Sequence, residues 1–232
     1  MYSLLIKYLV HKISIFHMNR ILQYFHKKEL KIIFDIGSYK GDFIDCFKKK
    51  HKKAFFYSFE PHQDNFLYQK KKYKYIKNIK LFNYGLSDNK TKLNLKVNYL
   101  SNASTFSEFN KTAYYFKIRK LILGKSKVTI SNQICNLNTL DNFVENNNTR
   151  VIDLLKLDVE GFELKVLKGA KKTLTMTKYI IIEITHSNIF QNYKKKEIHN
   201  FLTNNGFEKE KSFLFPIFNF EDRIYKNKSN FK

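Results

Sequence analysis

The fold is decided by residues 31–42, which read KIIFDIGSYKGD. Residues 31–36 form a short apolar run, which is typical of a strand buried in a parallel sheet. Gly37 permits a tight turn where this strand ends, and Gly41 lets the backbone approach a ligand or a neighbouring helix closely. A helix predicted over 42–50 then directs its first amides at the turn. The segment therefore predicts a strand, a ligand-binding turn and a helix.

The same alternation continues along the chain on both sides of this segment. Buried strands are predicted over 54–59, 79–84, 153–157 and 179–184, a half-exposed edge strand over 91–98, and one or two final strands before residue 225. Helices are predicted over 63–73, 161–168 and 197–204. This order predicts an α/β protein with a doubly wound, mostly parallel sheet, helices on both faces, and ligands at the carboxyl ends of the strands.

Two regions lie outside this pattern. Residues 1–30 are expected to be an N-terminal helical extension, because apolar residues recur at helical spacing over 1–29. The helix either packs on the flank of the domain or makes a weak contact with a membrane surface. Residues 31–232 are expected to form a single domain with a polar insertion at about 99–136, which is either a substrate loop or an excursion without a role.

Charge is a poor guide to the partners of this chain. Its 43 basic and 20 acidic residues give a net charge of +23. Only four of the basic residues are arginine, the residue that a dedicated nucleic-acid binder uses most. Lys, Asn, Ile, Phe and Tyr make up more than half of the chain, and their codons are rich in A and T. We therefore interpret the charge as a solvated surface and expect no nucleic-acid partner.

The N-terminus contains neither a membrane-spanning segment nor a secretory signal that we recognise. Lys7, His11 and Lys12 interrupt its apolar residues, and no small-residue cleavage site follows. The two cysteines, Cys46 and Cys135, make neither a disulfide framework nor a zinc site and suit a reducing compartment. We expect a cytoplasmic protein.

Three successive strand ends carry groups that suit one kind of cofactor. Asp35 precedes the glycine turn, where its carboxylate would repel a pyrophosphate and attract a cationic amino group. Tyr39 stands where a dinucleotide fingerprint has its middle glycine, which argues against a nicotinamide cofactor. Glu60, followed by Pro61, ends the second strand at the place where an acid accepts hydrogen bonds from ribose hydroxyls.

The third strand end completes this set with Gly85, Leu86, Ser87 and Asp88, small and polar residues that could line an adenine slot. An ammonium partner, a ribose partner and a base pocket together fit S-adenosylmethionine, which holds an adenosine and an amino acid but no phosphate. Each residue taken singly has a structural interpretation, as a helix cap, a turn cap or a surface acid. The ordered set favours the cofactor.

The most specific segment is residues 153–170, which read DLLKLDVEGFELKVLKGA. It resembles the signature K-x-D-x-E-G-x-E-x-x-V-L-x-G-A of the FkbM family of S-adenosylmethionine-dependent methyltransferases. The resemblance extends in order to FDIGSYKGDF, FEP, GLSD, NTLD and IIEI, and covers roughly residues 31–186. One departure is Ser38-Tyr39-Lys40, where the family more commonly has Ala-Asn-x.

The resemblance implies a class I methyltransferase fold, which is Rossmann-like, and methyl transfer to an oxygen. Family members commonly methylate hydroxyls of sugars or of polyketide-type natural products. Carried over by position, Asp35, Gly37, Ser38 and Gly41 would surround the methionine part of the cofactor. Glu60 and Pro61 would hold the ribose, and residues 85–88 would border the adenine.

The candidate catalytic residues follow the next two strands. Lys156, Asp158 and Glu160 alternate along one strand end and would project to one side, with Glu183 and His186 beside them. We predict Asp158 or His186 as the base that removes the proton of the acceptor, and Glu160 as the residue that orients the acceptor. Alternatively, Lys156 and Glu183 form a buried structural ion pair.

Carboxylates with an imidazole are usual metal ligands, yet the chain has no H-E-x-x-H and no paired-cysteine spacing. A metal stays open but unsupported, and we predict no metal site. The predicted function is an O-methyltransferase that uses S-adenosylmethionine and acts on a hydroxyl of a sugar, a glycan precursor or another small molecule. Two alternatives stay open: an RNA methyltransferase, and a basic protein that binds nucleic acid or a membrane surface without catalysis.

Overall fold

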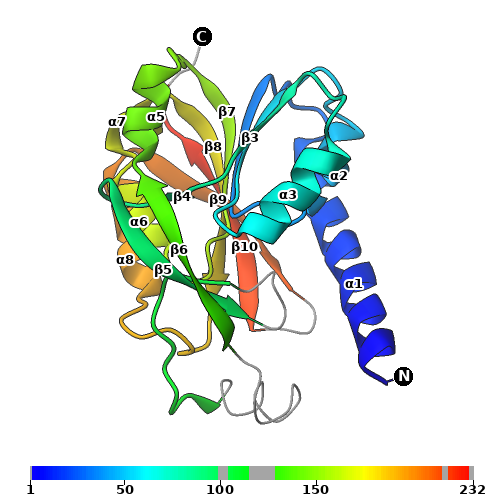
Figure 1. Ribbon diagram of the computed structural model, residues 1–232. Helices are drawn as coiled ribbons and strands as arrows, with labels where there is room; N and C mark the ends of the chain where they lie inside the picture. Colours follow the sequence, from blue (N-terminus) through cyan, green and yellow to red (C-terminus); the bar gives the residue numbers. More distant parts are fainter. Residues whose placement is uncertain (1, 99–103, 115–128, 216–218, 230–232) are drawn as a thin grey trace.

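The computed structural model describes residues 2–98, 104–114, 129–215 and 219–229 (Figure 1). Its main element is a seven-stranded sheet. The strands of this sheet are β1 (Ile32–Ile36), β2 (Phe55–Phe59), β3 (Ile79–Phe82), β7 (Ile152–Leu157), β8 (Thr177–Thr185), β9 (Phe207–Leu214) and β10 (Phe220–Asn227).

The order of the strands confirms the predicted doubly wound α/β fold. They lie in the order β3-β2-β1-β7-β8-β10-β9. β1, β2, β3, β7 and β8 pair in parallel, whereas β10 is antiparallel to both of its neighbours. The chain winds from β1 toward β3 on one side and from β7 toward β9 on the other. The crevice between the carboxyl ends of β1 and β7 is therefore the expected ligand site.

Helices cover both faces of the sheet, because its strands carry apolar side chains on both faces. In β8, Ile180 and Ile182 belong to one buried cluster and Ile181 to the other. Figure 1 shows α1, α2 and α3 on one side and α5 to α8 on the other. The helices are α1 (Tyr2–Phe25), α2 (Asp42–Lys48), α3 (Gln63–Lys72), α5 (Leu140–Asn146), α6 (Glu163–Lys168), α7 (Lys171–Thr175) and α8 (Lys195–Asn204).

The C-terminal half of α1 packs on the sheet. Ile21, Leu22 and Phe25 are buried in the cluster that also holds α2 side chains. His17 Nε2 lies 2.7 Å from a carboxylate oxygen of Asp222 on β10. Figure 1 shows the first turns of α1 standing away from the sheet. None of the helices in the described part of the chain is long and apolar enough to cross a membrane.

A second, three-stranded sheet lies next to the cofactor-binding edge predicted from the sequence. It has the order β4-β6-β5, formed by β4 (Gly85–Leu86), β5 (Thr91–Asn98) and β6 (Thr129–Asn138). Most of β6 falls inside the polar insertion predicted at 99–136, and no strand was predicted there. Residues 99–103 and 115–128 of that insertion lie outside the described residues. Within residues 104–114, Phe109 pairs with Phe190 in an isolated antiparallel β-bridge, which connects this segment to the rest of the domain.

Candidate active site

The glycine turn between β1 and α2 packs against the carboxyl end of β7. Gly37 has a φ of +78°, and a Cβ atom added there would lie 1.8 Å from the carbonyl oxygen of Asp158. Only glycine therefore lets the turn approach β7 this closely. The turn is also held by β2, because Gly37 N and Ser38 N donate to the carbonyl oxygen of Phe59 at 3.1 and 3.3 Å. These contacts fix the backbone at the point where the strand order reverses.

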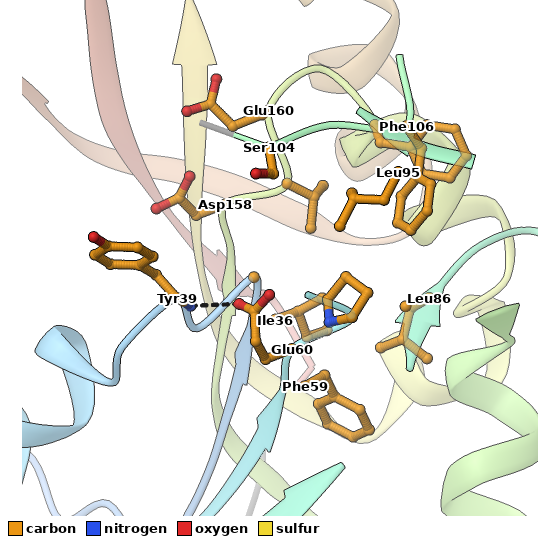
Figure 2. A pocket seen from close by; sticks show the side chains of 15 residues that line it. Ile36, Tyr39, Phe59, Glu60, Leu86, Leu95, Ser104, Phe106, Asp158 and Glu160 are labelled. Atoms are coloured by element: carbon orange, nitrogen blue, oxygen red, sulfur yellow. Dashed lines mark hydrogen bonds between the residues drawn. The ribbon is translucent and has the colours of Figure 1, made fainter. Parts of the chain in front are cut away.

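Glu60 follows β2 and is held by two backbone amides. Tyr39 N donates to its Oε2 at 2.7 Å, drawn as a dashed line in Figure 2, and His62 N donates to its Oε1 at 2.8 Å. Burial raises the pKa of Glu60 to about 8, against the opposing effect of these hydrogen bonds. Although it is only 6% exposed, the carboxyl group lines the pocket at this edge. The Asn65 side chain is a third hydrogen-bond partner of the carboxylate, which leaves one of its four acceptor sites for a further donor.

The pocket combines an apolar end with an acidic end. Its internal cavity has a volume of about 50 Å³. Figure 2 shows Leu86, Leu95 and Phe106 on one side and Asp158 and Glu160 on the other. The apolar residues come from β4, β5 and the 104–114 segment, and the acids follow β7. The small sheet thus supplies a wall that faces the carboxyl ends of the main sheet.

Half of the predicted cofactor residues reach this pocket. Those that line it are Gly37, Glu60, Pro61, Gly85 and Leu86. Those that do not are Asp35, Ser38, Gly41, Ser87 and Asp88. Ser38 is buried and accepts hydrogen bonds from Ser58 and from Gln69 at 2.7 and 2.8 Å, so it braces the turn from inside. Asp88 pairs with Lys165 of α6 at 2.9 Å.

A buried lysine of β7 pairs with two of the predicted acids. Lys156 Nζ lies 3.2 Å from Asp35 and 3.1 Å from Asp158, and not within ion-pair distance of Glu183. Burial raises the pKa of Asp35 despite the charge of Lys156, and the charges of Asp158 and Asp35 raise the pKa of Lys156 despite its burial. Asp35 was expected to attract a cationic amino group. Here Lys156 takes that place, and Asp158 is the acid that reaches the pocket.

Three acids from neighbouring strands follow Lys156 on the same face of the sheet. The strand register pairs Lys156 with Ile181 and pairs Asp222 with Glu183. Side chains two residues apart on a strand point to the same face. Asp158, at the end of β7, therefore lies in one row with Glu183 of β8 and Asp222 of β10. This is the face that α1 and α2 cover.

Asp158, Glu160 and Glu183 form an acidic cluster. One carboxylate oxygen from each lies within 4.8 Å of the others. Burial first, and then the charges of Asp158 and Glu160, raise the pKa of Glu183 well above its usual value. Glu160 has a φ of +52°, and its carbonyl oxygen accepts a hydrogen bond from Thr105 at 2.6 Å. The 104–114 segment thus holds the loop that carries Glu160.

His186, the other predicted base, lies apart from this cluster. It comes three residues after Glu183, an odd number, so its side chain is directed to the opposite face of the sheet. His186 Nε2 lies 3.2 Å from Glu221, and Nδ1 lies 3.1 Å from Lys195. It does not line the pocket. Of the two bases suggested by the sequence, only Asp158 is at the site.

Glu183 was expected beside Asp158 and Glu160 and lies there, although no catalytic role was predicted for it, whereas Asp222 was not predicted. Glu183 left a signal, since a carboxylate inside the apolar strand Ile181-Ile182-Glu183-Ile184 needs a special environment. No sequence pattern indicated Asp222, because its place beside Glu183 depends on the pairing of β10 with β8. Phe106 was also missed, since the insertion that contains it has no motif.

The chemistry of the residues that line the pocket suits S-adenosylmethionine. The apolar end suits an adenine ring, and the buried Glu60 carboxylate is placed to accept a hydrogen bond from a ribose hydroxyl. Asp158 and Glu160, at the other end, suit a sulfonium and an amino group, which are both cationic. Gly85 allows the close approach of Phe106, since a Cβ atom there would lie 2.9 Å from the Phe106 ring.

Solved structures show the same fold. The chain is similar to precorrin-6y C5,15-methyltransferase from Geobacter metallireducens GS-15, with a TM-score of 0.51 and 10% identity over 91% of this chain and 87% of the other. It is also similar to a proposed rRNA methylase from Clostridium thermocellum, with a TM-score of 0.51 and 10% identity over 91% and 96% of the two chains. No curated protein matches the chain in sequence.

The family comparison defines the class of protein as a methyltransferase that depends on S-adenosylmethionine. Residues 35–209 match the family model described as the methyltransferase FkbM domain. The chain belongs to the FkbM methyltransferase family, as the signature at 153–170 predicted, and its cofactor is S-adenosylmethionine.

Proposed function

We propose that the protein transfers the methyl group to a hydroxyl of a sugar, a glycan precursor or another small molecule. The observation that carries this proposal is the acidic cluster of Asp158, Glu160 and Glu183 at the acidic end of the pocket. A hydroxyl must lose its proton as it is methylated, and a carboxylate within reach accepts that proton. Carboxylates also accept hydrogen bonds from the other hydroxyls of a polyol.

Asp158 is the base in this proposal. It lines the pocket, and Lys156 at 3.1 Å holds its side chain in place. S-adenosylmethionine supplies a methyl group on a sulfonium; transfer to the acceptor oxygen breaks the C–S bond, leaves its electron pair on sulfur and releases the hydroxyl proton. Asp158 receives this proton. Glu160, on the same loop, orients the acceptor by accepting a hydrogen bond from it.

The cluster argues against RNA as the acceptor. Three carboxylates within 4.8 Å of one another repel a phosphodiester backbone that approaches the same opening. Arginine, which binds phosphate in a bidentate manner, is absent from the described residues that line the pocket. A neutral or cationic acceptor meets no such repulsion.

The cofactor part is tested first, by thermal unfolding with S-adenosylhomocysteine on the wild type and on Glu60→Ala. A ligand at about a hundred times its dissociation constant stabilises a protein by about 2.7 kcal/mol. We expect this shift in the wild type and a clear loss of it in Glu60→Ala. An unchanged melting temperature of the folded wild type at millimolar ligand contradicts the cofactor assignment.

The acceptor is tested with labelled S-adenosylmethionine and a panel of sugars, nucleotide sugars, hydroxylated small molecules and an RNA transcript. On the acceptor that is methylated, Asp158→Asn should lower the turnover by about a hundredfold or more. His186→Ala serves as the matched control, because His186 lies outside the pocket, and should retain most of the activity. Methylation of the RNA alone, or full turnover by Asp158→Asn, would overturn the proposal.

A further inference from the structure

We propose that α1 binds the protein to an anionic membrane surface through an apolar row at positions Leu5, Leu9, Ile13 and Phe16. These positions recur every three or four residues, so at 3.6 residues per turn they lie on one side of the helix. The proposal concerns where the enzyme binds, and it does not depend on which acceptor is methylated.

The row lies on the side of α1 opposite to the one that packs on the sheet. Phe16 and Phe25 are nine residues apart, which is about two and a half turns, so they point in opposite directions. Phe25 is fully buried, whereas Phe16 is 60% exposed. Figure 1 shows the first turns of α1 standing away from the sheet. Packing within the chain therefore accounts for Phe25 and not for Phe16.

The sequence of the helix combines this row with basic residues and no acid. Residues 1–28 contain no Asp or Glu, and Lys7 and Lys12 accompany the apolar row. Lysine side chains can lie along an apolar surface while their ammonium groups stay with the polar headgroups of lipids. Apolar and basic residues on one helix are typical of a segment that lies in the interface of an anionic membrane.

The end of β9 extends this surface onto the folded domain. Arg20, about one turn after Phe16, donates to the carbonyl oxygen of Leu214 at 3.3 Å, and Leu214 is 60% exposed. The guanidinium carbon of Arg20 and Nζ of Lys211 lie 5.6 and 5.2 Å from the centre of the Phe213 ring. Arg20 thus connects the apolar row with an exposed apolar residue and a second basic residue of β9.

Charge distinguishes the partners that such a surface could bind. Each chain carries a net charge of +23, so two copies that bring their helices together repel each other. RNA attracts the basic residues but has no apolar interior in which Phe16 could be buried. An anionic bilayer provides both, because its headgroups attract Lys and Arg and its acyl chains bury apolar side chains. The membrane surface is therefore the partner that this side of α1 fits.

Co-sedimentation of the full chain with vesicles tests the proposal. We expect binding to vesicles of phosphatidylcholine and phosphatidylglycerol, and little binding to vesicles of phosphatidylcholine alone. Phe16→Glu should weaken the binding at least about tenfold, because a carboxylate does not enter the apolar boundary of the bilayer. Tyr75→Glu is the matched control and should bind like the wild type. It makes the same change of charge at an aromatic residue that is 86% exposed, on the connection between α3 and β3.

Urea unfolding of each variant shows that it is folded, and its affinity for S-adenosylhomocysteine reports on the cofactor pocket separately. A wild type that binds S-adenosylhomocysteine but not the anionic vesicles overturns the membrane proposal and leaves the methyltransferase intact. Equal binding by Phe16→Glu and the wild type, or equal losses in Phe16→Glu and Tyr75→Glu, overturn it as well. Dimers of the wild type that Phe16→Glu abolishes, seen by sedimentation without vesicles, would assign the row to a second copy instead.

Discussion

At the scale of single residues, Glu60 shows how burial adjusts a side chain for binding. Its carboxyl group is 6% exposed, and burial is the largest influence on its pKa, which rises to about 8. The ionised form has one acceptor site left for a ribose hydroxyl, whereas the protonated form has lost an acceptor site. If Glu60 holds the ribose, as we propose, the affinity for adenosine depends on the proton that Glu60 carries.

We expect adenosine to bind more tightly as the pH rises through 8. A folded-state pKa above the ordinary value means that the acid is mainly neutral below about pH 7 and mainly ionised above about pH 9. The dissociation constant should fall by up to about tenfold between these limits. Calorimetry with adenosine measures this without interference from the amino group of the cofactor. Glu60→Gln should bind weakly at every pH, and the same pH dependence in this variant would exclude Glu60 as its origin.

Gly37 offers a second test at this scale. Gly37→Ala places a Cβ atom 1.8 Å from the carbonyl oxygen of Asp158, in addition to the strain of a positive φ. Gly206→Ala is a matched control, since Gly206 also has a positive φ but its nearest contact would be at 3.8 Å. The control should lose about 1 kcal/mol of unfolding free energy. Gly37→Ala should lose at least about 2 kcal/mol more and should bind adenosine poorly. Urea unfolding measures the unfolding free energy of both variants. Equal losses in the two would show that the turn moves away from β7 at no cost in stability.

At the scale of elements, α1 belongs to the folded body through its last turns. Phe25 is fully buried and packs its ring against Phe47 of α2 and Tyr179 of β8. His17 reaches Asp222, the acid that follows Glu183 across the sheet. α1 therefore lies along the face of the sheet that carries Asp158, Glu183 and Asp222, the acids at and beside the pocket.

We expect Phe25→Ala to lower the free energy of unfolding by about 3–5 kcal/mol, as for other buried aromatic residues. Phe16→Ala, on the same helix, should change it by less than about 0.5 kcal/mol, because Phe16 is 60% exposed. Urea unfolding measures both. If Phe25→Ala were as stable as Phe16→Ala, α1 would be a separate extension that adds nothing to the core.

At the scale of the whole molecule, the net charge of +23 acts on any polyanion. We expect RNA of any sequence to bind at low salt and to lose about a hundredfold or more in affinity between about 50 and 200 mM salt. The affinity for S-adenosylhomocysteine should be nearly constant over the same range, because binding of a small ligand releases few condensed counterions. Filter binding and calorimetry measure the two. Sequence-specific RNA binding that persists at the higher salt would contradict our interpretation of the charge.

Local patterns in the sequence were sufficient for the seven strands of the main sheet, the glycine turn and the family, whereas β6, α5 and α7 were not predicted. Each predicted feature depends on residues close together in the chain. Gly37 is needed because the chain turns sharply where β1 ends. An acid at the end of the next parallel strand always lies at the same place relative to that turn. The same holds for the loop after β7, because Asp158 and Glu160 are two residues apart and share a direction.

Tertiary structure alone decided which groups meet. Lys156 lies between Asp35 and Asp158 because β1 and β7 are neighbours, and this pairing removed Asp35 from the pocket. Glu183 joins the acidic cluster, and His186 leaves it, because alternate residues of a strand face opposite sides of the sheet. Asp222 lies in one row with Asp158 and Glu183 because β10 pairs antiparallel with β8. Such contacts depend on the distance in space between strands, which a one-dimensional pattern does not contain.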